Sequence, residues 1–217
     1  MSPVSLLSDA IRERSRDAHS SSESVGFMSE LLKGERSRDD YIALVAQHYF
    51  IYAALEEAAS RMAADPVAST FISDKLTRLP ALKADLEFLL GPSWRDEISP
   101  LATTARYVAR IEQVGRTWAG GFVAHHYTRY LGDLSGGQYI GRAVAKQFGF
   151  DTNGIGFYLF SDIADPRAFK EVYREQLDAA PWDDAEKERV IDEVLAAYRF
   201  NTELFEELGR AQARAVA

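Results

Sequence analysis

The chain has 217 residues and a formal net charge of −8, from 25 Lys and Arg against 33 Asp and Glu. This acidic balance argues against nucleic-acid binding, which requires concentrated positive charge. The absence of Cys excludes disulfides, thiolate metal sites and cysteine nucleophiles. No segment is apolar enough to span a membrane, and the N-terminus has no apolar run typical of a signal peptide. We therefore expect a cytoplasmic protein with one sizeable domain.

Apolar residues recur with helical spacing along nearly the whole chain, which predicts an all-α domain without repeats or linkers. The expected helices cover 5–19, 27–34, 39–64, 66–90 with an interruption at Pro80, 100–118, 122–148, 166–179 and the segment from 183 onward. Asp65-Pro66 and Ser99-Pro100 are expected to begin helices, and Gly120-Gly121 to separate two of them. We expect a core over 5–209 and a frayed tail over 210–217.

The segment 122–148 reads as one long helix that carries several glycines in its middle. Gly132, Gly136, Gly137 and Gly141 each cost roughly 1 kcal/mol of helix stability relative to alanine. Glycine lets another object approach the backbone closely, and Asp133 places a carboxylate beside this bare surface. Spacing alone leaves several possibilities open: a platform for a ligand, tight packing of a second helix, a turn, or a kink.

A row of charged residues follows the N-terminal helix. Arg12, Arg16, His19 and Glu23 are spaced by four, three and four residues, so they share one face if the helix continues. Such a row suits a ligand that is both metal-bearing and anionic. The alternative is a solvated charged face with one surface histidine, and spacing alone favours that alternative.

Histidine supplies the remaining candidates for metal chemistry. Without Cys, the axial ligand of a haem would most plausibly be His19, His48, His125 or His126. Only His19 has a carboxylate, Glu23, one helical turn away that can accept the other ring N–H. His48 lies on an apolar stripe, where a buried structural histidine is the usual interpretation. His125 and His126 point about 100° apart on a helix and cannot chelate one ion.

The run YTRYLGDLSGGQ (127–138) resembles the signature of the haem oxygenases, and collinear blocks extend the match over nearly the whole chain. These blocks are RDAHSSSE (16–23), FMSELLKG (27–34), YFIYAALEE (49–57), GFYLFSDIAD (156–165), FKEVYR (169–174) and FNTELFEELG (200–209). The soluble bacterial members are the most similar. The resemblance implies a single domain over 1–217, with haem sandwiched between a proximal N-terminal helix and a kinked, glycine-rich distal helix.

The resemblance also implies roles for individual residues. His19 would be the proximal ligand of the haem iron, with Glu23 as its partner. Asp133 would organise water for proton delivery, together with Tyr52, Arg129, Gly132 and Gly136. The other residues implied to contact or back the haem are Arg12, Met28, Tyr127, Gly137, Lys170, Arg174, Phe200 and Phe205. Of these, Arg12, Lys170 and Arg174 would hold the propionates; relatives commonly have Lys at position 12, and Arg preserves the charge.

The implied activity is oxidative opening of haem b, which is both substrate and cofactor, by dioxygen. The products would be biliverdin, as the α isomer, carbon monoxide and ferrous iron. Electrons would come from a separate ferredoxin or flavoprotein reductase, and the protein would be a monomer. Its use in iron acquisition, pigment synthesis or haem detoxification is left open. Two alternatives from other classes are a haem carrier without turnover and a helical interaction module without haem.

Overall fold

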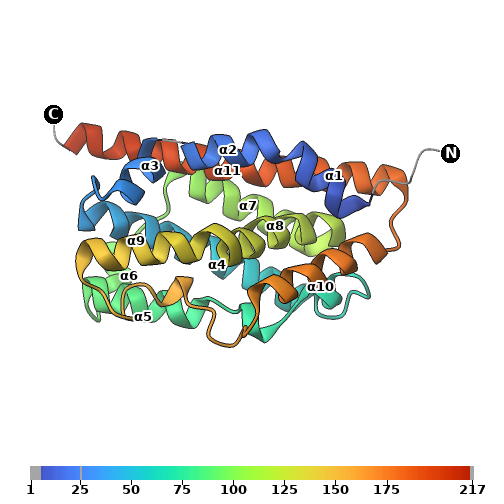
Figure 1. The fold of residues 1–217 in the computed structure, drawn as a ribbon, viewed down its shortest axis with the longest axis horizontal. Helices are drawn as coiled ribbons and strands as arrows, with labels where there is room; N and C mark the ends of the chain where they lie inside the picture. Colours follow the sequence, from blue (N-terminus) through green and yellow to red (C-terminus); the bar gives the residue numbers. More distant parts are fainter. Residues whose placement is uncertain (1–5, 25, 216–217) are drawn as a thin grey trace.

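The computed structural model describes residues 6–24 and 26–215, and the side chains of 6–20 and 26–210. In this part of the chain every regular element is a helix, which confirms the all-α prediction (Figure 1). The α-helices are α1 (Leu7–Arg14), α2 (Arg16–Ser24), α3 (Gly26–Lys33), α4 (Arg38–Met62), α5 (Leu79–Leu90), α6 (Trp94–Glu97), α7 (Ala102–Thr117), α8 (Ala119–Gly132), α9 (Gln138–Phe148), α10 (Pro166–Ala179) and α11 (Asp184–Ala215). Short 3₁₀ segments occur at Ala68–Phe71, Asp74–Leu76 and Gly156–Tyr158, and a π-helical segment, η3, spans Asp133–Gly137.

The long helix α4 lies inside the molecule and packs against α5, α7 and α8. Its Tyr41, Leu44, Ile51 and Leu55 are fully buried, and burial of each of the three aliphatic side chains contributes about 1.5–3 kcal/mol. α11 packs against α8, α7 and α2, so α2 and α11 lie side by side along one edge while α8 and α9 cross the middle (Figure 1). The site described below therefore lies between the α2–α11 pair and the α8–α9 helix.

Helix α5 begins later than the sequence predicts. The Asp65 carboxylate does accept hydrogen bonds from the N–H groups of Val67 and Ala68, at 2.9 and 2.8 Å. Only 3₁₀ turns follow, and α5 starts at Leu79 with Pro80 in its first turn. Proline is favoured there because the first-turn N–H groups have no partner within the helix. Pro80 thus begins a helix, and the predicted interruption was wrong.

Two other predicted helix boundaries were also wrong. Helix α7 has no cap from Ser99; the Glu207 carboxylate on α11 instead accepts the N–H groups of Ala102 and Thr103, at 3.3 and 2.8 Å. Gly120 and Gly121 lie inside the first turn of α8, where a Cβ on Gly121 would collide with the Trp118 ring and one on Gly120 with Glu186 and Val190. The break between α7 and α8 is Trp118 itself, with extended backbone at φ −143° and ψ 99°.

The C-terminal helix is longer than expected. Asp183 begins it as predicted, because its carboxylate accepts the N–H of Glu186 at 2.8 Å. The helix passes Gly209 and continues to Ala215. α11 gains support along its length from α2 and α3. No helix in the described ranges is both long and apolar enough to cross a membrane.

Candidate functional site

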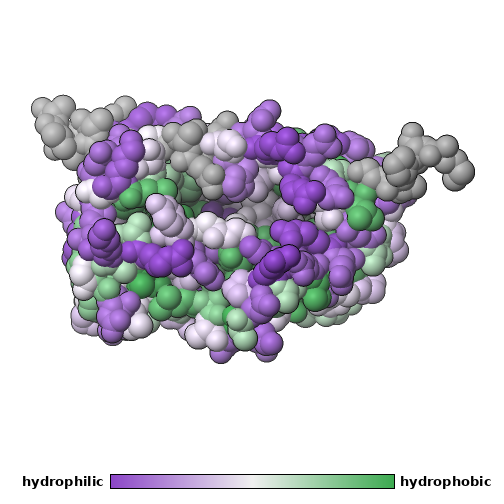
Figure 2. Space-filling model, in the orientation of Figure 1, coloured by the Kyte–Doolittle hydropathy of each residue, from purple (hydrophilic) through white to green (hydrophobic). Residues whose placement is uncertain are grey.

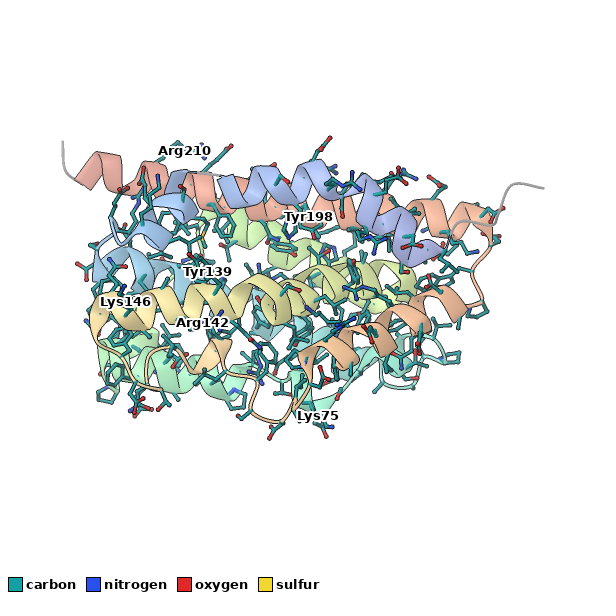
Figure 3. All side chains as sticks on the ribbon, in the orientation of Figure 1. Lys75, Tyr139, Arg142, Lys146, Tyr198 and Arg210 are labelled. Atoms are coloured by element: carbon teal, nitrogen blue, oxygen red, sulfur yellow. The ribbon has the colours of Figure 1, made fainter. Side chains whose placement is uncertain are left out.

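Two adjoining cavities open between α2 and the α8–α9 helix, with volumes of about 310 and 350 Å³. They share His19, Gly132 and Tyr198 as lining residues, so together they form one slot. Figure 2 shows the surface hollowed at the centre of this face, and Figure 3 shows Tyr198 pointing from α11 toward the α8–α9 helix. The two volumes are of the size of small-molecule and cofactor pockets.

Cationic side chains border the outer cavity. Arg12, Arg16 and Arg174 all line it, from α1, α2 and α10 respectively, together with Tyr127. Arg12 also pairs with Asp9 at 2.8 Å, but its side chain is 70% exposed and can reorient. The predicted row of charges is split, since α1 ends at Arg14 and α2 begins at Arg16. The outer cavity is therefore suited to anionic groups such as carboxylates.

Lys170 lies beside this cationic cluster and is not part of the lining. Its ammonium donates a hydrogen bond of 2.9 Å to the Ser135 hydroxyl, and that hydroxyl donates to the Leu131 carbonyl at 2.7 Å. Because Ser135 lines the outer cavity, Lys170 still places positive charge at its rim. The ammonium keeps two further N–H donors, so a ligand carboxylate at the rim could accept from Lys170 without displacing the Ser135 contact.

The inner cavity is largely apolar on the side away from the arginines. Its apolar lining comes from α3, α4, α9 and α11 and consists of Met28, Leu32, Leu44, Ile140 and Phe205. Phe200 was expected near the haem, but the structure does not bring it to either cavity. It stacks on Tyr107, with ring centroids 4.8 Å apart and an angle of 6° between planes. The reason is helical spacing on α11, where residues 198, 201 and 205 face the slot and residue 200 points away from them.

The glycines of the long helix fall into two groups. A Cβ at Gly132 would meet nothing within 4 Å, and Gly132 borders both cavities. A Cβ at Gly141 would lie 2.8 Å from the Cβ of Tyr158, and one at Gly137 would lie 3.3 Å from the Tyr158 ring. Gly132 therefore keeps space open for a ligand, whereas Gly141 permits packing. The π-helical segment between them is a feature often found at functional sites.

This division gives opposite expectations for two matched substitutions. Gly132→Ala should leave the thermal midpoint within about 1 °C of wild type, or raise it, because alanine favours the helix, yet it should weaken haem binding by filling the slot. Gly141→Ala should lower the midpoint by several degrees, as overpacking typically costs about 1–3 kcal/mol. Thermal unfolding of the apoprotein and hemin titration measure the two effects. If both variants lose stability equally, Gly132 has a packing role.

Asp133 begins the π-helical segment and connects the slot to a buried polar network. The Tyr52 hydroxyl donates to Asp133 Oδ2. Arg129 donates from Nε to the Tyr52 hydroxyl at 3.3 Å and from Nη1 to Asn201 Oδ1 at 2.9 Å. Burial raises the pKa of Asp133 to about 6, even though the Arg129 charge, the Tyr52 hydrogen bond and the Arg78 charge act to lower it. Asp133 can therefore hold or release a proton near neutral pH.

The raised pKa of Asp133 predicts a specific pH dependence of stability. Its folded-state value of about 6 lies above the ordinary value of 3.8, so its contribution to stability is complete below about pH 4 and is lost as pH rises through 6. Asn cannot ionise. The free energy of unfolding of Asp133→Asn, relative to wild type, should therefore rise by about 2 kcal/mol between pH 4 and pH 7.5. Urea unfolding of the two apoproteins at several pH values measures this difference, and a constant difference would contradict the raised pKa.

The four histidines occupy different environments. His19 is half-buried on α2, lines both cavities and contacts Tyr198 edge-on, with ring centroids 5.8 Å apart. His125 Nε2 lies 2.8 Å from Glu193 Oε1, and His126 Nδ1 lies 2.9 Å from the Tyr173 hydroxyl. Both of these rings are buried, and neither borders the slot.

His19 therefore stands on the opposite wall of the slot from Gly132 and Asp133. The side chain of its expected partner Glu23 lies outside the described residues. Residues that sequence reasoning did not place in the slot also line it: Ser15, Arg16, Ser20, Leu32, Leu44, His48, Thr128, Leu131, Ser135, Tyr139, Ile140, Tyr158, Tyr198 and Asn201. For most of these, spacing alone does not separate a core position from a cavity wall.

The residues present fit a flat, apolar ligand that has an anionic edge and a metal centre. The space above Gly132 accepts a flat surface, His19 offers an imidazole from the other wall, and the arginines border one end. Fold and site together define an all-α haem-binding protein.

Comparisons with known proteins agree with this assignment. The family model described as Heme oxygenase matches residues 5–207. Heme oxygenase 1 of Synechocystis is 39% identical over 202 residues, covering 93% of this chain and 84% of that protein. Heme oxygenase 1 of Homo sapiens is 40% identical over 205 residues, covering 93% and 71%. The crystal structure of the Synechocystis enzyme in complex with heme superposes with a TM-score of 0.92 at 38% identity, covering 98% and 96% of the two chains.

The chain belongs to the haem oxygenase family. It is a haem oxygenase that takes haem as both substrate and cofactor.

Proposed function

We propose that the chain opens haem at the α-meso carbon and releases biliverdin IXα, carbon monoxide and ferrous iron. The observation that supports this most strongly is the single slot that joins His19 on one wall to Gly132 and Asp133 on the other. Bound haem supplies the iron centre at which dioxygen is reduced and activated. The protein holds the macrocycle, keeps room beside it, and moves protons.

His19 would hold the haem iron from the α2 side through one ring nitrogen. Gly132, opposite, leaves space for dioxygen and water because it carries no side chain. A bulkier residue at this position would fill that space. Asp133 delivers protons into the space through water, and its pKa of about 6 suits both release and uptake of a proton near neutral pH.

Tyr52 and Arg129 keep the Asp133 carboxylate oriented. Tyr52 donates to Oδ2, and Arg129 fixes Tyr52 while bonding to Asn201 on α11. Both residues are buried; Arg129 borders the inner cavity and Tyr52 lies behind its wall. Their role is therefore to position the Asp133 carboxylate. The network leaves the other carboxylate oxygen of Asp133 available for water in the slot.

The α isomer follows from anchoring of the propionates at the arginine end of the slot. Arg12, Arg16 and Arg174 gather at that end of the slot, where they would hold the propionates and so set the rotation of haem in its plane. Arg174→Ala should therefore yield a mixture of biliverdin isomers. Relative to wild type, the fraction of the α isomer should fall more than the total rate of biliverdin formation. Chromatography of the extracted bilins measures the isomer ratio. A pure α product from Arg12→Ala, Arg174→Ala and the double variant would remove the arginines from this role.

The electrons come from a separate donor protein, because the chain has no Cys for an iron–sulfur cluster and no dinucleotide fingerprint. The purified haem complex should convert haem in air when a ferredoxin with its reductase, or a flavoprotein reductase, and NADPH are added. It should not do so with NADPH alone. Conversion by NADPH alone would contradict a separate donor.

The protein acts as a monomer of 24.2 kDa, which light scattering of the haem complex would test.

A further inference from the structure

Two buried polar atoms, which belong to residues lining the inner cavity, have no hydrogen-bond partner among the described residues. They are Nδ1 of His48 and the hydroxyl of Tyr158. Both residues line the same cavity as Asp133. A buried polar group without a hydrogen bond costs about 1–3 kcal/mol, and in folded proteins such groups usually bond to ordered water. The role described above for Asp133 and its network uses neither residue.

The fold fixes both side chains firmly in place. His48 lies one turn after Leu44 on α4, and its ring packs against Phe157 and Tyr52, with centroids 4.9 and 6.3 Å away. Tyr158 belongs to the segment that Asp85 holds, since the Asp85 carboxylate accepts the N–H groups of Gly156 and Phe157 at 2.9 and 2.8 Å. The Tyr158 ring also packs against Phe157, with centroids 4.8 Å apart. This packing limits the rotation of both side chains toward another partner.

The chemistry of the two groups suits water. Burial lowers the pKa of His48 well below its ordinary value, and the nearby charge of Arg129 lowers it further, so the ring is neutral at pH 7. A neutral imidazole offers one donor and one acceptor, and a tyrosine hydroxyl offers both functions as well. The cavity, at about 350 Å³, is large enough for water beside a ligand, and it also presents Asp133 and Asn201.

We propose that His48 and Tyr158 form a water-binding site beside the inner cavity, which extends the Asp133 network. His48 is then a positioning residue for proton delivery. The water site rests on geometry alone, and its part in proton delivery rests on the proposed function. When the water beside Asp133 gives up a proton, the neighbouring water held by His48 passes one of its own protons to it. That second water is reprotonated from solvent in the slot, and the imidazole itself stays neutral before and after.

High-resolution crystal structures of the apoprotein and of the haem complex test the water site directly. We expect ordered water about 2.7–3.2 Å from His48 Nδ1 and from the Tyr158 hydroxyl in wild type. His48→Leu should lose the water at position 48 and keep the Asp133–Tyr52 contact. A wild-type structure without water at either atom, or with either atom bonded to a protein group, would overturn the proposal. This readout does not depend on turnover.

The part in proton delivery is tested by solvent isotope effects on single turnover of the haem complex. His48→Leu should slow biliverdin formation about fivefold, less than loss of a general acid itself, and should increase the ratio of rates in H₂O and D₂O. His48→Gln, which retains a donor and an acceptor, should recover most of the rate. Equal rates and isotope effects in His48→Leu and wild type would overturn this part, provided that both variants keep the wild-type thermal midpoint. If wild type itself forms no biliverdin, the proposed function fails while the water site stands.

Discussion

Asp133→Ala is expected to bind haem with nearly unchanged affinity and to form biliverdin at least about a hundredfold more slowly. The carboxylate contributes little to holding the macrocycle, which is gripped by His19, the arginines and the apolar inner wall. It is, however, a titratable group in the slot, with a pKa of about 6 that lies close to neutral pH. Removing it also leaves Tyr52 and Arg129 without the group that they orient. In this variant the bound haem should either remain intact or be destroyed without forming biliverdin.

Hemin titration followed at the Soret band gives the affinity, and bilin extraction after single turnover gives the yield. Asp162→Ala is the matched control, because Asp162 is an exposed aspartate outside the slot. Asp133→Asn should behave like the alanine variant in yield, since an amide cannot supply the proton. A wild-type biliverdin yield from Asp133→Ala would remove Asp133 from proton delivery.

His19→Ala should lose the protein ligand of the haem iron and fall to a few per cent of wild-type activity or less. Without the imidazole, the iron would have either water or no ligand on the α2 side. The arginines and the apolar wall would still hold the ring. The substitution also opens a hole in the α2 wall large enough for free imidazole. Millimolar imidazole should therefore restore a low-spin or histidine-like spectrum and a substantial part of the activity.

The matched control is His48→Leu, because His48 is the other histidine that lines the slot. His125 and His126 are held by Glu193 and Tyr173 and face away from it. Resonance Raman spectra of the ferrous haem complexes should show the iron–histidine stretch in wild type and His48→Leu, and its absence in His19→Ala. Persistence of that stretch in His19→Ala would assign the iron to another histidine.

Helical periodicity alone predicted most of the helices, because each buries one continuous apolar face. The predictions failed where a boundary depends on residues distant in sequence. The N-terminus of α7 is capped by Glu207 from α11. Gly120 makes room for Glu186 and Val190 of α11, and Gly121 makes room for the Trp118 ring. Pro80 allowed two interpretations from sequence, a break or a beginning, and only the turns before it decide between them.

The site was predicted in part from spacing and in larger part from the family resemblance. Spacing singled out His19 and the glycine cluster, but it could not tell that Gly132 faces open space while Gly141 faces Tyr158. Local pattern assigned His48 to the core, and it is buried there, yet its ring also reaches the cavity. Whether a buried polar side chain faces a cavity depends on packing between helices, which no single stretch of sequence encodes.

The most direct test of the whole account is single turnover of the purified haem complex in air with an added electron-donor system. Absorption spectra, trapped carbon monoxide and extracted bilins are recorded together. The account predicts that the Soret band disappears while biliverdin and carbon monoxide appear in equal amounts, one of each per haem. A Soret band that persists, or that bleaches without biliverdin and carbon monoxide, would contradict it.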